Sequence, residues 1–138
     1  MPSPKYNPAE LLNLILDEAN LAIRKRHVNA YLTTVLLASG ARTASGEGSS
    51  TDLGNTKELV VTLDVSAVGG TTPTLDVKLQ HSPDGVKWSD LGTAFAQKTG
   101  VSREVKAFTQ YHRYVKAVYT IGGTTPSFTF SVEATAKE

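Results

Sequence analysis

The pentapeptide Gly-Gly-Thr-Thr-Pro occurs twice in the chain, at Gly69–Pro73 and again at Gly122–Pro126. Each copy follows a stretch rich in β-branched residues and precedes a stretch in which apolar and polar residues alternate. Glycine permits positive φ angles, and proline removes a backbone donor at the point where the next strand begins. The repeat therefore predicts one strand–loop–strand arrangement that is used twice, which is typical of an all-β domain.

The similarity between the two copies is local. The apolar alternation of Leu75–Leu79 matches that of Phe128–Val132, but before the repeats the match fails, because Leu63 corresponds to Lys116. A shift of one residue exchanges the two faces of a strand. We therefore expect the loop and the strand that leaves it to be repeated, but not a whole half-domain.

Short β-branched and apolar stretches, separated by turns that contain Gly and Pro, predict an antiparallel β-sandwich or jelly-roll-like barrel of about eight strands over residues 29–138. The expected strands cover residues 31–38, 57–68, 73–82, 86–91, 94–97, 101–108, 111–121 and 127–136. Residues 40–55 are expected to form a loop, because Gly, Ser, Thr and Ala dominate there. Ser82-Pro-Asp-Gly85 has the pattern of a type I turn.

Alternation within the strands also predicts which side chains face the core, because antiparallel strands commonly have one buried and one solvated face. The residues expected to face the core are Leu59, Val61, Leu63, Val65, Ala67, Leu75, Val77, Leu79, Val115, Ala117, Tyr119, Ile121, Phe128, Phe130, Val132 and Ala134. The opposite faces carry mainly polar residues and are expected to be solvated.

Residues 1–28 differ from the rest and are expected to form an N-terminal arm. Asn7 suits a helix N-cap, Pro8 the first helical position and Glu10 the third, which predicts a helix over about residues 8–19. A helix of this length is marginal alone in water, and its apolar sector is wide, so we expect it to bind a partner. The residues expected to contact that partner are Leu11, Leu12, Leu14, Ile15, Leu16, Ile23, Arg24 and Arg26.

Composition excludes several classes of function. The formal net charge is +1, and the basic run Arg24-Lys-Arg26 has no interleaved aromatic residues, so nucleic acid is not an expected partner. The chain has no cysteine, which excludes disulfides and thiolate metal sites. No apolar run approaches the roughly 20 residues that cross a bilayer, and the N-terminus lacks a secretion signal, so a soluble protein made without Sec export is expected.

No constellation of residues predicts catalysis, a cofactor or a metal. His27, His81 and His112 lack the spacing of metal ligands. Asp84 and Asp90 flank the single tryptophan, but a glycosidase needs two carboxyls held about 5–10 Å apart across a cleft, and the turn explains Asp84 better. We therefore expect a protein that is not an enzyme.

The stretch Ser82–Trp88, a turn followed by a tryptophan on a strand, resembles discoidin-like and other carbohydrate-binding sandwiches. This resemblance implies that Trp88 could stack on a sugar, with a cell-surface glycan as partner. The alternative, that the tryptophan packs in the core or over its edge, is favoured.

Most of the chain resembles a family of small β-sandwich proteins encoded by tailed bacteriophages and prophages. The stretches that carry the resemblance are Ala41–Ser45, Glu58–Val65, Gly70–Gly85, Arg113–Lys116 and Gly122–Val132. In addition, Asn7–Ala19 followed by Leu21–Arg24 is similar to arms that open many phage virion proteins, although Lys25-Arg-His27 replaces the apolar strand that usually follows.

The resemblance implies a structural part of a virion, made in the cytoplasm of the host bacterium. The first hypothesis is a capsid decoration (cement) protein whose arm binds the major capsid protein and stabilises the shell. An adaptor at the portal, tail or fibres is the alternative with the same fold, and a carbohydrate-binding module centred on Trp88 is the alternative from another class. A homo-oligomer is expected, and trimers are common among such decoration proteins.

Overall fold

The computed structural model describes residues 31–138, and every regular element among them is a β-strand. The strands are β1 (Tyr31–Arg42), β2 (Gly46–Glu47), β3 (Thr51–Asp52), β4 (Glu58–Ser82), β5 (Ser89–Leu91), β6 (Ser102–Thr109) and β7 (Tyr114–Lys137). All pairings between these strands are antiparallel, which confirms the predicted all-β antiparallel class. Within this described part, no helix is long and apolar enough to span a membrane.

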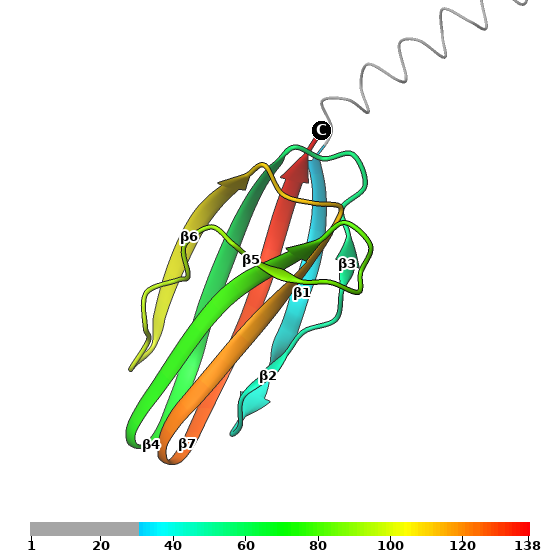
Figure 1. The fold of residues 1–138 in the computed structure, drawn as a ribbon. Coiled ribbons are helices and arrows are strands. Elements are labelled where there is room, and N and C mark those ends of the chain that lie inside the picture. The colour runs from blue at the N-terminus through cyan, green and yellow to red at the C-terminus, as the bar shows by residue number, and fades with distance from the viewer. Residues whose placement is uncertain (1–30) are drawn as a thin grey trace, which may run out of the picture.

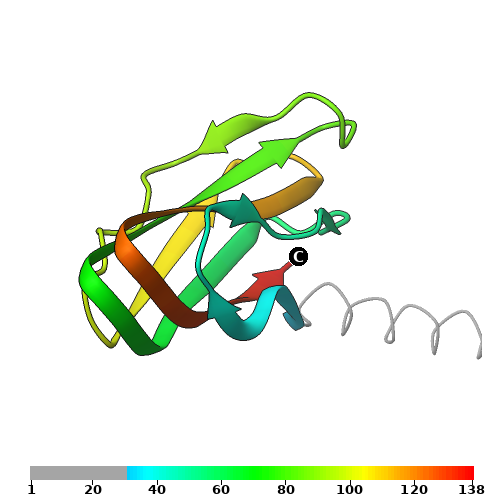
Figure 2. The ribbon, with the colours of Figure 1, turned by 90° about the horizontal axis from the view of Figure 1, so that it is seen from below.

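The two longest strands, β4 and β7, form an antiparallel ribbon around which the fold is built. Their pairing runs from Glu58 opposite Lys137 to Ser82 opposite Tyr114. Figure 1 shows that this ribbon runs to one end of the molecule, turns back on itself and returns. The two Gly-Gly-Thr-Thr-Pro copies make the turn and lie side by side, as the view from below shows (Figure 2). The ribbon thus has two halves, which face each other across the core.

The two repeat copies adopt the same conformation and pack against each other. Gly70 and Gly123 have φ angles of 100° and 114°, and Thr72 and Thr125 have φ angles of 47° and 46°. A Cβ atom on Gly70 would lie 2.5 Å from the carbonyl oxygen of Thr125, and one on Gly123 would lie 2.7 Å from that of Thr72. Each glycine is therefore required both for its φ angle and for the close approach of the other copy. The sequence repeat is a pair of reciprocal corners.

The shorter strands widen both halves of the ribbon. In the first half, β1 pairs with the C-terminal part of β7, and β6 pairs with the N-terminal part of β4. In the second half, β5 pairs with the C-terminal part of β4, while β2 and β3 pair with the N-terminal part of β7. All seven strands belong to one sheet. The domain is therefore a single curled sheet folded over on itself, with seven described strands instead of the expected eight or so.

The core lies between the two halves and draws alternate side chains from both. The largest fully buried side chains are Phe128, Phe130, Leu53, Leu59, Leu63, Leu75, Leu79, Val61, Val65, Val77, Val115 and Val132. This confirms most of the predicted alternation, although Tyr119 and Ile121 are only partly buried against the core. Core residues that the alternation did not predict come from β1, from strand ends and from loops: Leu36, Leu37, Leu53, Leu91, Phe95, Phe108 and Ala136.

The prediction that Ala67 faces the core is wrong, because its side chain is exposed. In β4, Val65 lies opposite Phe130, but Ala67 lies opposite Thr129, so Ser66 is an extra residue. Such a β-bulge places two residues opposite one and exchanges the faces of the strand. The bulge is also the physical reason why the stretches before the two repeats differ in register.

The prediction of a loop over residues 40–55 is also wrong. β1 continues to Arg42, and β2 and β3 each pair with β7. Leu53 is fully buried, and its N–H donates a 2.8 Å hydrogen bond to the carbonyl of Arg113. The composition wrongly predicted a loop because the strands in this segment are only two residues long. A single buried leucine, Leu53, holds the segment against the core.

Two of the predicted short strands are smaller than expected. Only Ser89–Leu91 of the predicted strand 86–91 pairs with β4. The predicted strand 94–97 does not appear as a strand, although the N–H of Phe95 donates a 2.9 Å hydrogen bond to the carbonyl of Val77. The buried Phe95 ring therefore fixes this segment where strand propensity is too weak to do so.

Candidate interaction surface

One end of the molecule carries both the first described residue and the C-terminus, whereas the repeat corners lie at the opposite end (Figure 1). Tyr31 opens β1 directly opposite Lys137. A cleft of about 430 Å³ lies at this end, lined by Tyr31, Leu32, Asp52, Leu53, Gly54, Asn55, Thr56 and Glu138. We call this region the arm-end surface, because residues 1–30 join the domain here.

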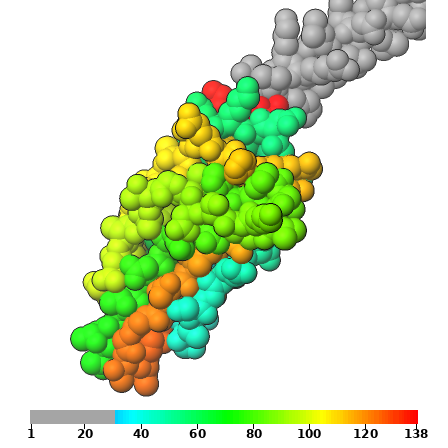
Figure 3. All heavy atoms as spheres, in the orientation of Figure 1, coloured from blue at the N-terminus to red at the C-terminus, as the bar shows by residue number. Residues whose placement is uncertain are grey.

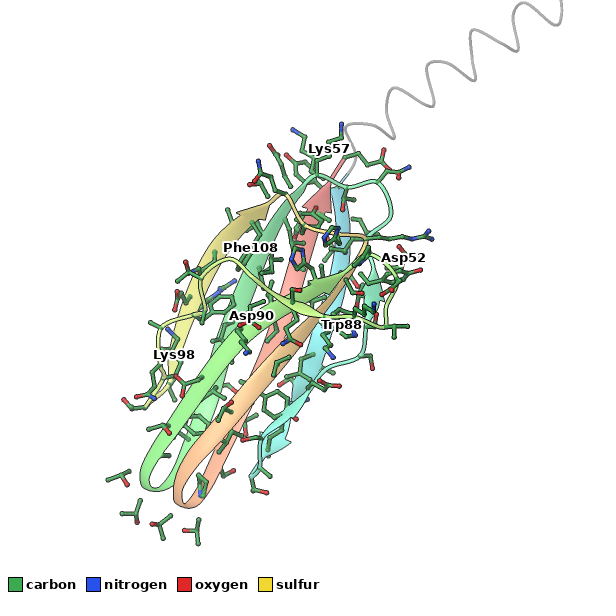
Figure 4. The ribbon with its side chains drawn as sticks, viewed as in Figure 1. Asp52, Lys57, Trp88, Asp90, Lys98 and Phe108 are labelled. Carbon is green, nitrogen blue, oxygen red and sulfur yellow. The ribbon has the colours of Figure 1, made fainter. Side chains whose placement is uncertain are left out.

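Hydrogen bonds fix one wall of the cleft. Asp52 accepts hydrogen bonds from Arg113, at 2.9 Å from Nε and 2.7 Å from Nη2, and from the N–H of Gly54 at 2.9 Å. The Arg113 guanidinium, with the Gly54 amide, lowers the pKa of Asp52 to about 2. The hydroxyl of Tyr111 donates to Thr56 Oγ1 at 2.9 Å. Figure 4 shows Asp52 at this side of the domain. The side chains of this wall are thus ion-paired or hydrogen-bonded, and these contacts fix their positions.

The β1 side of this end is apolar and exposed: Tyr31 and Leu32 line the cleft, and Val35 lies further along the strand, outside it. Tyr31, Leu32 and Val35 of β1 are 67%, 48% and 51% exposed. Leu32 lies opposite the buried Ala136, so it occupies a core-facing position that the other half of the sheet does not cover. Exposing apolar side chains to water costs free energy, and binding of an apolar partner removes that cost. The arm-end surface therefore leaves apolar side chains in contact with solvent.

The residues that the sequence predicts as partner contacts lie in residues 1–28, outside the described residues. Those contacts, and the boundary between arm and domain, stay predictions. Sequence reasoning missed Tyr31, Leu32 and Val35 as surface residues, since an apolar β-strand is normally assigned to the core. The available signal was that β1 carries no charged residue before Arg42 and comes directly after the arm.

Trp88 lies at the edge of the second half of the sheet and is partly buried (Figure 4). The Lys116 ammonium lies 4.4 Å from the centre of its ring and forms a 3.0 Å ion pair with Glu47. Asp84 caps the preceding turn, and Asp90 accepts hydrogen bonds from two β4 side chains. The tryptophan thus packs over the edge of the fold, and both aspartates have structural partners. Figure 3 shows that the segment around it covers much of one face of the domain.

Two of the three histidines form a pair. The ring centroids of His81 and His112 lie 4.7 Å apart, and the backbone N–H of His112 donates to His81 Nδ1 at 3.1 Å. Burial, and then the positive charge of His112, lower the pKa of His81. Across residues 31–138, no group of three or more His, Asp or Glu side chains could hold a metal ion. His27 lies outside this range.

Acid should destabilise the domain through its depressed carboxyls. The amides of Lys87 and Val86 and the hydroxyl of Ser82 lower the pKa of Asp84 to about 2. A carboxyl with a depressed folded pKa contributes stability above its unfolded pKa of about 3.9, and that contribution is lost as the pH falls through about 2. In thermal unfolding followed by circular dichroism, we expect Asp84→Asn to melt below the parent protein at neutral pH. The difference should vanish near pH 2. A difference that is independent of pH would contradict this origin.

Neither a protein-family model nor a curated protein matches the sequence. Solved structures show the same fold at low identity. YomS, derived from the SPBc2 prophage, aligns with a TM-score of 0.52 and 13% identity over 78% of this chain and 92% of YomS. The PBSX exported protein XepA aligns with a TM-score of 0.55 and 12% identity over 77% of this chain but 37% of XepA.

The fold is not confined to phage-derived proteins. Murine APRIL aligns with a TM-score of 0.50 and 11% identity over 78% of this chain and 98% of APRIL. At such identities the similarity establishes the curled antiparallel β-fold and no shared activity.

Proposed function

We propose that the protein is a non-enzymatic structural component of a bacteriophage virion, and specifically a capsid decoration protein that binds the shell through its N-terminal arm and stabilises it. Two independent observations support the class: the sequence resemblance to phage β-sandwich proteins, and the occurrence of this fold in the prophage-derived YomS. The proposed location is the virion, and the proposed partner is the major capsid protein.

The observation that carries the proposal is that the two ends of the domain differ in surface chemistry. The arm joins at the arm-end surface, where Tyr31, Leu32 and Val35 are exposed beside a cleft. The threonine-rich corners lie at the far end (Figure 1). The arm end thus presents exposed apolar side chains beside the arm, and the repeat corners expose threonines to solvent, an arrangement that suits attachment to a shell through the arm end.

The predicted arm supplies the rest of the attachment. A short amphipathic helix can lay its apolar face into a groove of a partner, with Leu12 and Ile15 as central anchors. Arg24 and Arg26 follow and would meet acidic groups on the shell. Many copies on a symmetric shell add avidity to an individually weak contact.

A density map of the assembled particle tests the proposal. We expect one domain at each of many symmetric positions on the outer shell, with the arm-end surface against capsid protein and the corners outward. Density confined to the portal, tail or fibres would replace decoration by the adaptor role. Absence of the protein from purified particles would overturn the virion role altogether.

Carbohydrate binding through Trp88 is the hypothesis from a different class, and tryptophan fluorescence separates the two. We expect the emission maximum to stay unchanged when glycans are added, because Lys116 covers one ring face and is itself held by Glu47. As a control, Lys116→Ala should shift the emission by exposing the ring. A glycan-dependent shift in the parent protein would favour the carbohydrate-binding module instead.

A further inference from the structure

The edges of a β-sheet expose unpaired N–H and C=O groups, and proteins normally protect them. In the second half of the sheet, β2, β3 and β5 are protected by their shortness, with two, two and three residues. β5 also carries Asp90, which forms a 3.1 Å ion pair with Lys78. These edges therefore offer little backbone to another chain.

The β6 edge of the first half is protected by charge and by cover. Lys98 forms a half-buried ion pair with Glu104 at 2.6 Å, and Glu104 also accepts a hydrogen bond from the N–H of Ala96 at 3.0 Å. Lys106 donates to the carbonyl of Ala94 at 3.2 Å. Segment 94–98 thus lies along β6 and is joined to it by side chains, which closes this side of the curled sheet.

The C-terminal half of the β1 edge is protected as well. The Arg42 guanidinium donates to the carbonyls of Ala38 and Gly40 on its own strand, at 2.7 Å and 3.0 Å, and to that of Phe130 on β7 at 3.1 Å. Gly48 lies so close to the carbonyl of Leu36 that a Cβ atom would approach its oxygen to 2.4 Å. From Leu36 to Arg42, therefore, register shifts, the bridging Arg42 side chain and the close approach of Gly48 interrupt the regular edge.

The N-terminal half of β1, Tyr31–Val35, has none of these protections. Its sequence, Tyr-Leu-Thr-Thr-Val, contains no charge, no proline and no glycine. Within residues 31–138 its backbone pairs only with β7, on one side. An exposed, uncharged and apolar edge of this kind is a template for pairing with another strand.

We propose that the Tyr31–Val35 edge pairs antiparallel with the same edge of a second copy of this chain, with Thr33 on the twofold axis. In this register Tyr31 of each copy lies opposite Val35 of the other on the outer face of the sheet. Aromatic residues opposite β-branched residues are favourable cross-strand pairs. The edge strand itself carries no charge, and its β7 neighbours differ in sign, with Lys137 beside Tyr31 and Glu133 beside Val35. Two copies therefore meet without placing like charges opposite each other, and the first halves of both sheets join into one continuous sheet.

The pairing is weak in solution and becomes effective where copies are concentrated. Five residues on each side bury much less than the roughly 1,200–2,000 Å² of stable complexes. Dimers should therefore form at high protein concentration, or on a surface that holds neighbouring copies close together. The inference concerns the purified chain, so its test is independent of the proposed role in the virion.

Engineered cysteines in the full-length chain test the register, because the natural chain has none. Directly opposed residues of antiparallel strands have Cα atoms about 4.5–5.5 Å apart, within the range of a disulfide. We expect Thr33→Cys to form a disulfide-linked dimer under mild oxidation. Tyr31→Cys alone and Val35→Cys alone should not, since each would lie about 13 Å from its own copy, but an equal mixture of the two should crosslink. Val105→Cys on β6 is the exposed control that should stay monomeric.

A charge on the twofold axis should weaken the pairing strongly. Thr33→Lys places two like charges opposite each other, and we expect it to weaken self-association in sedimentation equilibrium by at least about tenfold. Ala107→Lys, on the exposed side of β6, should leave self-association unchanged, and circular dichroism should show that both variants are folded. The proposal would be overturned if the Val105 cysteine crosslinked as much as the Thr33 cysteine. It would also be overturned if Thr33→Lys left self-association unchanged. A trimer whose copies do not contact each other at residues 31–35 would also overturn the proposal.

Discussion

Replacement of Gly70 by alanine is expected to lower the free energy of unfolding by about 2–4 kcal/mol, because it combines backbone strain with a steric clash. The φ angle of 100° is one that alanine rarely adopts. The new Cβ would lie 2.5 Å from the Thr125 carbonyl oxygen and 2.9 Å from Pro126 Cα. Both contacts are with backbone, so the second repeat copy would have to move. Chemical denaturation followed by circular dichroism measures the effect.

Two other glycines separate the causes of this loss. Gly54 has a φ angle of 58° but open space around its Cβ position, so Gly54→Ala should cost about 1 kcal/mol through strain alone. Gly100 has open space and no unusual φ angle, so Gly100→Ala should change stability by less than about 0.5 kcal/mol. Equal stability of the Gly70 and Gly100 variants would contradict the close packing of the two corners.

Replacement of Phe130 by alanine should lower the free energy of unfolding by about 3–5 kcal/mol. The ring is fully buried where the two halves of the ribbon meet. It packs edge-on against Tyr119 with centroids 5.3 Å apart, and the Arg42 guanidinium lies 5.0 Å from its centre. Its loss leaves a cavity and also removes a contact of Arg42, whose guanidinium joins carbonyls of β1 and β7.

Val105→Ala is the matched control for this truncation, because Val105 is an exposed β-strand residue. We expect it to change the free energy of unfolding by less than about 0.5 kcal/mol. If Phe130→Ala and Val105→Ala unfolded at the same denaturant concentration, the two halves would not share the core described above. A large loss for Phe130→Ala alone supports it.

The core was largely predictable from the sequence, because alternation is a local signal. Leu59 to Val65 and Phe128 to Ala134 alternate in the printed order and face the core as expected. Ala67 was not predictable in the same way. One extra residue in β4, Ser66, shifts the register, and only the pairing with β7 reveals it.

The arrangement of the edges could not be predicted, because it depends on contacts between distant residues. The sequence gives no sign that Arg42 covers the carbonyls of its own strand, or that segment 94–98 lies along β6. These contacts decide that Tyr31–Val35 is the open edge. Likewise, the GGTTP repeat predicts two loops but not that they pack against each other, because the two copies come from strands that are far apart in the chain.

The arm truncation tests the proposed attachment most directly. Full-length protein and a chain that lacks the predicted arm, residues 29–138, are each mixed with particles that lack the protein, and the bound fraction is measured by sedimentation. The buried cluster consists of residues of the domain, so the truncated chain should keep the circular dichroism spectrum of a folded β domain. We predict that the full-length chain sediments with the particles and that the truncated chain does not. A folded truncated chain that binds at full occupancy would contradict attachment through the arm.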